Sequence, residues 1–398
     1  MHALPQDHTG TRIARLRRER HLTQRALSEL ANIPYSTLTK VEQGAAPASP
    51  HVVGACARAL RVEVSTIQGQ PYADELRADQ LDVLIRPIRE ALDVYDLGPD
   101  PDVRARQPEE LHREAEQLCA DVRAGHIKNV ASRVAGLIEE GTTAAHTAQT
   151  REGWLTLASF YRTAYDVAAK LGYPDLAQLS LARLDWAAQR GSDAVLGGMH
   201  HYMRALSYLR DGKYRTGHRL VRLGLSTLEQ AEPGRERQAV TGQLHLGAAV
   251  LSGRAHDAEQ AHVHLDEAEQ IAAKTGEAME VHWLAFGPTN VRVHRVSVLS
   301  ALDQYGKAVE EAEKTRIPKG WANSRTSHHY AEVARSFLWT GNLDASFESL
   351  LRARKAAPQQ AKYHPTVRET YAGLEAAHRR LPNSFLSYGA WLGPSPAH

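Results

Sequence analysis

Apolar segments of helical length, separated by short turns, recur along most of the chain, from about residue 107 to about residue 382. Gly172, Gly212 and Gly253 mark turns about 40 residues apart, and Gly341 follows about two further periods on, beyond a turn near residues 303–306. A unit of this kind cannot cover its own apolar face, so several must stack on one another. The sequence therefore predicts an all-α chain whose larger part is an array of paired helices with a concave surface.

These repeats are similar to tetratricopeptide repeats (TPRs), with helices longer than in the usual unit of ~34 residues. The expected architecture is a TPR-like α-solenoid over residues 107–385, serving as a sensor and dimerisation domain, followed by a C-terminal tail over residues 386–398. Residues 70–106 are predicted to form a connecting helix, from Asp74 to Tyr95, and a linker with a Gly98-Pro99-Asp100-Pro101 break. Concave surfaces of such arrays bind peptides, other proteins or extended ligands.

Residues 8–69 contain five short helical patterns and form a separate unit. Thr23 is expected to cap the run Gln24 to Ala31 through its hydroxyl, and Pro34 begins the run Tyr35 to Gln43, which stops at Gly44. A fourth run follows Ser49-Pro50, and a last turn lies near residues 65–67. The positions predicted to face the core of this unit are Ile13, Leu16, Ala26, Leu27, Leu30, Leu38, Val41, Val53, Cys56 and Leu60.

The segment RIARLRRERHLTQRALSELANIPYSTLTKVEQG resembles the XRE-type helix-turn-helix domains of the phage-repressor family. The resemblance implies that double-stranded operator DNA is a partner and that the Tyr35–Gln43 helix enters the major groove. Lys40 then meets a guanine edge, whereas Thr23 and Gln24 meet the phosphate backbone. It also implies a buried ion pair between Arg17 and Glu42. The DNA-binding residues implied are Thr23, Gln24, Tyr35, Ser36, Thr39, Lys40 and Gln43.

The alternative for these positions is that Tyr35 only packs within the domain and that Lys40 is an ordinary solvent-exposed lysine. The segment also departs from the family in two places. Pro34 stands where the family usually has a Ser or Thr cap, and the AAPAS stretch after Gly44 lacks the usual Lys or Arg. Fewer phosphate contacts weaken DNA binding, so we expect a homodimer.

One stretch, residues 283–297, interrupts the repeats with a Gly287-Pro288 turn between apolar residues. Together with the helix-turn-helix pattern of residues 8–69, it resembles actinobacterial regulators with TPR-like repeats and, more loosely, the peptide-sensing quorum regulators of Gram-positive bacteria. The resemblance implies a peptide or small-molecule effector clamped by an amide side chain. The ligand-binding residues predicted are Asn290, His294, Trp283 and Phe286. Thr289 or Asn290 is expected to cap the helix that follows. The alternative is that Asn290 is only a helix cap and His294 an interior histidine.

The sequence contains no recognisable motif for catalysis, metal binding or cofactor binding. No H-E-x-x-H or G-x-S-x-G motif occurs, so we expect no enzyme, no metal site and no cofactor. The N-terminus has no signal-peptide pattern, no stretch reaches the ~18–20 apolar residues of a membrane span, and Cys56 and Cys119 are far apart. These features favour a cytoplasmic protein with no membrane partner. Residues 1–70 carry nine Lys or Arg against five Asp or Glu, a modest basic excess that suits a polyanion partner.

The sequence therefore predicts a transcriptional regulator controlled by a peptide or small molecule bound in the TPR-like domain. Two alternatives remain: a TPR scaffold that docks a partner protein, and a phage-type repressor without a small ligand.

Overall fold

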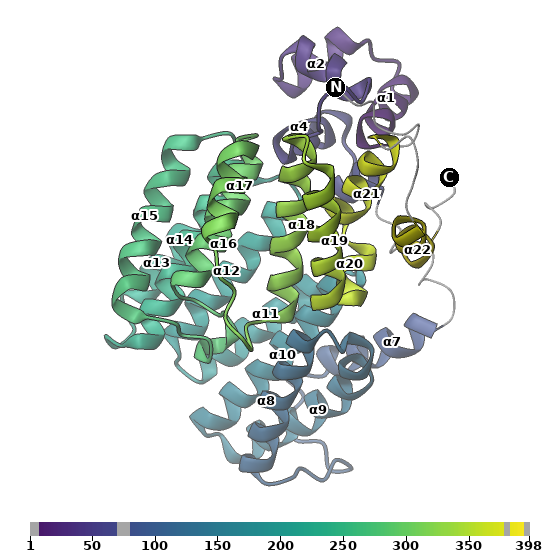
Figure 1. The fold of residues 1–398 in the computed structure, drawn as a ribbon. Helices are drawn as coiled ribbons and strands as arrows, with labels where there is room; N and C mark the ends of the chain where they lie inside the picture. The colour runs from purple at the N-terminus through teal and green to yellow at the C-terminus, as the bar shows by residue number, and fades with distance from the viewer. Residues whose placement is uncertain (1–7, 70–79, 378–382, 394–398) are drawn as a thin grey trace.

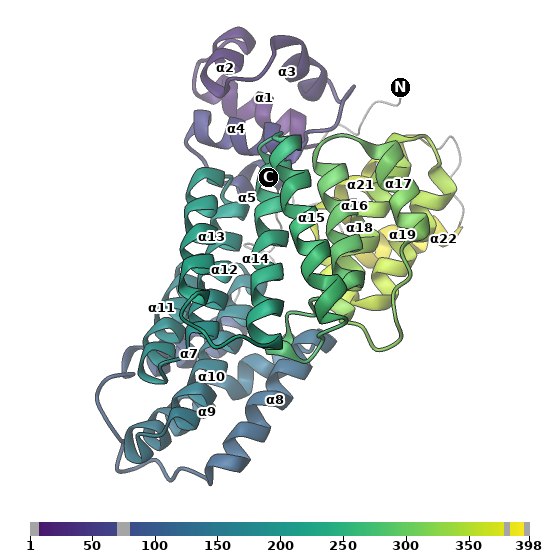
Figure 2. The same ribbon diagram turned by 90° about the vertical axis from the view of Figure 1, so that its left-hand side faces the viewer.

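The structure is a computed structural model that describes residues 8–69, 80–377 and 383–393. Within these ranges, helices make up all the regular structure apart from one isolated bridge between Ala278 and Phe286. The predicted all-α class is therefore confirmed. Figures 1 and 2 show a small N-terminal bundle, which we call the head, lying over the ends of helices in a much larger helical array, which we call the body.

The head contains five helices, and local signals set their ends as predicted. Thr23 Oγ1 accepts a hydrogen bond from the Ala26 amide at 3.1 Å. Pro34 precedes the third helix without a side-chain cap, and Gly44 takes the left-handed conformation, with φ 71°, just beyond its end. The helices are α1 (Thr9–Glu19), α2 (Gln24–Ala31), α3 (Tyr35–Glu42), α4 (Pro50–Leu60) and α5 (Val64–Gln68).

The head has its own apolar core, in which Ile13, Leu27, Leu38 and Cys56 are fully buried. Leu30 was predicted to share this core, and that prediction is wrong, because its side chain is 62% exposed. The buried stripe of α2 runs through Leu27, Ser28 and Ala31. At about 100° per residue, Leu30 lies outside that stripe.

The body is a series of antiparallel helix pairs (Figures 1 and 2). One continuous core joins the helices from α7 to α16, and a second core joins α18, α19, α21 and α22. The helices are α7 (Gln80–Asp93), α8 (Pro108–Ala124), α9 (Ile127–Ala148), α10 (Arg151–Leu171), α11 (Pro174–Arg190), α12 (Ala194–Arg210), α13 (Tyr214–Leu228), α14 (Arg235–Arg254), α15 (Ala258–Thr275), η1 (Val281–Trp283), α16 (Pro288–Ala301), α17 (Tyr305–Lys314), α18 (Asn323–Trp339), α19 (Leu343–Ala356), α20 (Pro358–Tyr363), α21 (Pro365–Ala377) and α22 (Asn383–Leu392).

Most of the predicted turn glycines lie at helix ends in the left-handed region, with φ 81° at Gly172, 68° at Gly212 and 84° at Gly341. Gly253 was also assigned to a turn, but it is buried within the last turn of α14. The turn falls two to four residues later, where His256 takes a φ of 61°. In the sequence, a glycine inside a helix cannot be distinguished from a glycine that ends one. Only the packing of the helix shows which of the two it is.

The predicted connecting helix is part of the body. Its first residues, 74–79, lie outside the described residues, and α7 begins at Gln80. Ile85, Ile88 and Leu92 are buried in the same core as α9 to α11. Because α7 buries its own apolar face there, the body begins before residue 107.

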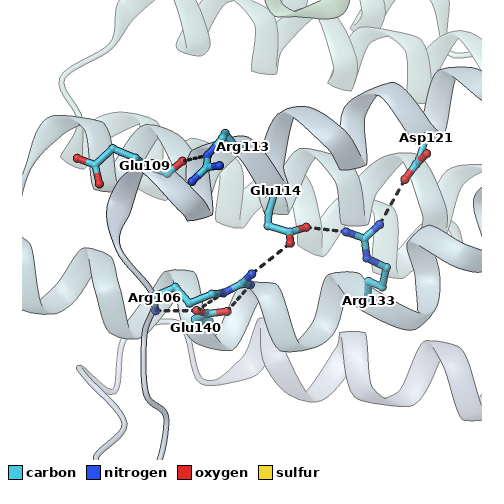
Figure 3. Close-up of polar contacts among 7 residues, drawn as sticks. All are labelled: Arg106, Glu109, Arg113, Glu114, Asp121, Arg133 and Glu140. Atoms are coloured by element: carbon cyan, nitrogen blue, oxygen red, sulfur yellow. Dashed lines mark hydrogen bonds and ion pairs between the residues drawn. The ribbon is translucent and has the colours of Figure 1, made fainter.

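An ionic brace holds the linker that follows α7 against α8 and α9 (Figure 3). Arg106 donates to both carboxylate oxygens of Glu140 at 2.8 Å and to Glu114 at 3.1 Å. Glu114 also accepts from Arg133 at 2.6 Å. Hydrogen bonding to Arg106 lowers the pKa of the Glu140 carboxyl. The brace fixes where the linker enters the array.

The predicted tail over residues 386–398 begins too early. Helix α22 continues to Leu392, and Phe385, Tyr388 and Leu392 are buried. The Tyr388 hydroxyl donates to the Leu350 carbonyl at 3.2 Å, so α22 is packed against α19. The burial of these aromatic rings stabilises α22 against the body, although the sequence shows no repeat pattern there.

The head is docked on the body through α4. Arg58 donates to the Gly212 carbonyl at 2.6 Å, and the Tyr214 hydroxyl donates to the Pro50 carbonyl at 3.0 Å. Gly54 lies so close to the body that a Cβ added to it would be 2.8 Å from the Tyr214 hydroxyl and 3.4 Å from Gly212 Cα. The head therefore rests on the turn between α12 and α13.

Candidate nucleic-acid interface and ligand site

The third helix of the head presents a polar face to solvent. Tyr35 is 51% exposed, Ser36, Lys40 and Gln43 are exposed, and Thr39 is partly buried. The opposite face carries the buried residues Leu38, Val41 and Glu42. Figure 2 shows α2 and α3 at the end of the head farthest from the body, with α4 between them and the array. Among the described elements, α3 packs against α1 and α2 of the head.

Behind this face, the ion pair implied by the family resemblance is present. Arg17 donates from Nε to Glu42 Oε1 at 2.7 Å and from Nη2 to Glu42 Oε2 at 2.9 Å. The remaining guanidinium nitrogen, Nη1, donates to the Leu22 carbonyl at 2.8 Å. The hydrogen bond with Glu42 raises the pKa of Arg17 despite the opposing effect of burial. This bidentate pair ties α1 to the C-terminal end of α3.

Gln24 belongs to the same network. Its Nε2 donates to Glu42 Oε2 at 2.7 Å, and its Oε1 accepts from the Tyr35 hydroxyl at 3.5 Å. One of the two amide hydrogens of Gln24 is therefore engaged inside the head, and one is left for an outside acceptor. Sequence reasoning assigned Gln24 to the phosphate backbone alone and missed its part in fixing α3.

The four residues predicted to bind a ligand do not share one environment. Phe286 is fully buried, and its ring lies so close to Gly242 that a Cβ there would be 2.0 Å from the ring. It is therefore a core side chain and not a pocket wall, and its backbone pairs with Ala278. Trp283 is partly buried, and the Arg123 guanidinium lies 3.8 Å from the centre of its ring.

Asn290 and His294 lie one turn apart on α16, as expected. Asn290 is fully buried, donates to Gln243 Oε1 at 3.0 Å and accepts from Arg325 at 3.4 Å. His294 donates from Nδ1 to the Asn290 carbonyl at 2.8 Å. Burial and the neighbouring Arg325 lower the pKa of His294 to about 3, so the ring is neutral and its Nε2 is an acceptor.

Neither Asn290 nor Thr289 caps α16, so the expected cap is wrong, and so is the alternative that Asn290 is only a helix cap. Gly287 occupies the N-cap position without a side-chain bond. Glu277 supplies the missing acceptor, because its Oε1 receives the Thr289 amide at 2.8 Å. A carboxylate from another segment therefore takes over the role that local sequence would give to Thr or Asn.

Three arginines that sequence reasoning missed join these residues inside the array. We call Arg123, Arg162 and Arg325 the interior arginines. Burial, followed by repulsion from Arg162, lowers the pKa of Arg123 to about 9. None of the three forms an ion pair with any residue that the structure describes. Arg162 donates instead to the His282 carbonyl, and its Nε has no partner there.

No pattern in the sequence marks these arginines. They lie on α8, α10 and α18, each within an ordinary amphipathic helix where an arginine is usually a solvated surface residue. Only the stacking of helices brings them to Trp283 and Asn290. The result is a cationic region lined by one aromatic ring, one amide and one neutral imidazole.

The described residues contain no group of three or more His, Cys, Asp or Glu side chains that could hold a metal ion. Over the same ranges, no helix has both the length and the apolar character that a membrane crossing requires.

Comparison with known proteins assigns the head alone. Residues 8–67 match a family model described as "Helix-turn-helix domain". No curated protein matches the chain. A solved structure of PlcR from Bacillus thuringiensis, in complex with the peptide PapR7 and DNA, is similar over 86% of this chain and 98% of that chain, at 14% identity and a TM-score of 0.30. A likeness of that size leaves the body to be interpreted from its own residues.

Proposed function

Because residues 8–67 form a helix-turn-helix domain, we propose that the protein is a sequence-specific, DNA-binding transcriptional regulator that acts as a homodimer and responds to a peptide or small molecule. The observation that carries DNA binding is the exposed polar face of α3, backed by the buried Arg17–Glu42 pair. A helix that contacts bases must be held in a fixed orientation, and this pair fixes α3 against α1.

Two parts of the head have different roles in DNA recognition, the polar face of α3 and the start of α2. Lys40 and Ser36 are exposed and can donate to base edges in the major groove. The start of α2 meets the phosphate backbone through its free amides, with Thr23 and the second amide hydrogen of Gln24. The AAPAS stretch after Gly44 carries no Lys or Arg, so one head makes few phosphate contacts. Two heads on one operator supply the missing affinity.

The ligand site that we propose consists of Trp283, Asn290, His294 and the interior arginines. Two observations support it: the arginines there form no ion pair with a carboxylate among the described residues, and His294 offers an acceptor beside them. Helix α16 packs against α14, and the turn after α14 brings His256 within 4.9 Å of His51 on α4. A ligand that prefers one arrangement of these helices therefore changes the position of the head.

DNA binding is tested by in vitro selection from a random duplex library with the purified full chain, followed by footprinting. The expected result is a two-fold symmetric site whose half-sites lie about one helical turn, ~34 Å, or a multiple of it, apart. A selection that enriches no sequence would contradict the proposal and favour the scaffold alternative, in which the body docks a partner protein.

Ligand control is tested with a small-molecule extract of the native host. The full chain should retain a compound, identified by mass spectrometry, that changes its affinity for the selected operator. Trp283→Leu should lose both the compound and the response. The matched control is Trp339→Leu, since Trp339 stacks on Tyr305 and lies outside the proposed site. Equal responses in both variants would remove Trp283 from the site, and no response in the wild-type chain would favour a repressor without a ligand.

A further inference from the structure

A cavity of about 390 Å³ lies where the beginning of the body meets its end. Its walls come from the turn between α8 and α9, from the last turn of α10, from α20 and the first residues of α21, and from Trp391 on α22. Figure 1 shows the C-terminal helices, drawn in yellow-green, next to the blue α10. None of Trp283, Phe286, Asn290 and His294 lines it. We call it the seam cavity.

The charges that line the seam cavity are all of one sign. Lys128, Lys170 and Lys362 contribute ammonium groups, His364 contributes an imidazole, and none of the described lining residues is Asp or Glu. Ile127, Leu171 and Trp391 supply apolar wall, with two prolines beside them. A cavity of this size, with apolar walls and a few polar groups of matched sign, has the make-up of a small-molecule site.

Lys170 connects α10 to the C-terminal part of the body across this cavity. It is partly buried near the end of α10, and its Nζ contacts Gln360 Oε1 across the seam at 3.5 Å. The Gln360 amide donates to the Ser324 carbonyl at 2.9 Å, which turns Oε1 toward Lys170. Within the described chain, no carboxylate lies within the 4.0 Å of an ion pair to Lys170.

The surroundings of Lys170 disfavour its charge. Burial lowers the pKa of the Lys170 ammonium, Asp166 raises it in part, and Arg325 and Arg210 lower it further. A buried cation of this kind is costly unless an anion or an acceptor accompanies it. An anionic group placed in the cavity would contact Lys170 and Lys128 and offset that cost.

We propose that the seam cavity binds a small organic anion, a carboxylate or a phosphate ester with an apolar or aromatic part. Its anionic group contacts the ammonium groups of Lys170 and Lys128, and its apolar part packs against Leu171 and Trp391. The bound molecule bridges α10 and α20, two elements that the chain separates by 190 residues at the Lys170–Gln360 contact. This site is independent of the DNA-binding role proposed above.

The test measures binding of defined probes to the purified full chain by isothermal titration calorimetry. The probes are 1-naphthoate, 1-naphthyl phosphate, the neutral 1-naphthamide and inorganic phosphate. Both naphthyl anions should bind at least about tenfold more tightly than the amide, because a hydrogen bond to a charged group is lost in the neutral probe. Tighter binding of the phosphate ester or of the carboxylate identifies which anion the cavity prefers, and either result supports the proposal.

Lys170→Met removes the ammonium and keeps the apolar stem. It should weaken both naphthyl anions about tenfold or more and leave the amide unchanged. The matched control is Lys319→Met, an exposed lysine outside the cavity, which should change nothing. Lys128→Met gives a second reading from an exposed position whose loss does not disturb packing. Trp391→Leu should weaken the naphthyl anions but not inorganic phosphate.

The proposal is overturned if the amide binds as tightly as the anions, or if Lys170→Met and Lys128→Met both retain wild-type affinity for them. Absence of binding of either naphthyl anion at millimolar concentration also overturns it. Operator affinity, measured in parallel, does not enter this decision.

Discussion

Arg58 on α4 donates a hydrogen bond to the carbonyl of Gly212 at 2.6 Å, across 154 residues of sequence. This bond seats the head on the turn between α12 and α13, and the guanidinium also lies 5.8 Å from the ring centre of Tyr214. Gly212 can offer its carbonyl there because it takes a φ of 68°, which favours glycine. The position of α3 relative to the array therefore depends on a contact between the Arg58 side chain and the backbone of the turn between α12 and α13. Docking of the head can be tested separately from its stability.

Gly54→Ala should undock the head without unfolding it. Alanine is favoured over glycine within a helix by ~0.5–1 kcal/mol, so the isolated head should become more stable. In the full chain, the new Cβ lies 2.8 Å from the Tyr214 hydroxyl and 3.4 Å from Gly212 Cα. Hydrogen exchange of α4 amides should therefore be faster in the full-length variant. Gly136→Ala is the control, because nothing lies within 4 Å of its added Cβ. Unchanged exchange in Gly54→Ala would mean that the head and body are not held at this contact in solution.

Docking of the head should weaken on acidification through His51. Burial lowers the pKa of His51, and the nearby His256 and Arg58 lower it further, against the raising effects of the Arg254 backbone and Asp303. A histidine whose pKa is lowered in the docked state stabilises that state fully above its ordinary pKa of ~6.5. The stabilisation is lost as the pH falls through the lowered pKa.

The same α4 hydrogen-exchange measurement, made between about pH 8 and about pH 5, checks this direction after correction for intrinsic rates. His51→Phe keeps a ring beside His256 and removes the titration, so its docking should depend less on pH. A wild-type head that docks more firmly at the acidic end would show that the sign is wrong.

Glu42→Ala should melt the head before the body. The Glu42 side chain is 4% exposed and the Arg17 side chain 10%, so the substitution leaves a nearly buried guanidinium without its partner. Loss of one partner of a buried pair typically costs ~3–5 kcal/mol, which approaches the whole stability of a small domain. Calorimetry of the full chain should show an early transition for the head. Glu29→Ala, at an exposed position of α2, should not. A single unchanged transition in Glu42→Ala would contradict the expected energetic weight of the pair.

Lys40→Ala and Gln24→Ala should separate base reading from positioning. If Lys40 reads a guanine, its loss relaxes preference at one base step by about 1–3 kcal/mol and leaves the stability of the head intact. Gln24→Ala should weaken all sequences alike. It should also destabilise the head by about 1 kcal/mol, because Gln24 donates to Glu42. Binding across an operator library, together with melting curves, checks both. Unaltered sequence preference in Lys40→Ala would make Lys40 a bystander.

The sequence alone was sufficient for features carried by neighbouring residues. Thr23, Pro34 and Gly44 bound the head helices as predicted, because caps and turns depend on a few consecutive side chains. Apolar periodicity was enough to predict an all-helical array. Each run has the length and the single apolar face of an amphipathic helix, and such helices cover that face by stacking on one another. The helix-turn-helix domain could be recognised for the same reason: its signature lies within about 60 consecutive residues.

Tertiary structure decided what joins distant segments. Stacking placed Arg123 against Trp283, and it brought Lys170 to Gln360 across 190 residues. It also exposed Leu30 and buried α22, where a helix supplies the apolar pattern but a neighbour decides which face is covered. Local patterns cannot predict these contacts, because an arginine on an amphipathic helix reads the same in sequence whether it faces water or another helix. Its environment is determined only when the neighbouring helices pack against it.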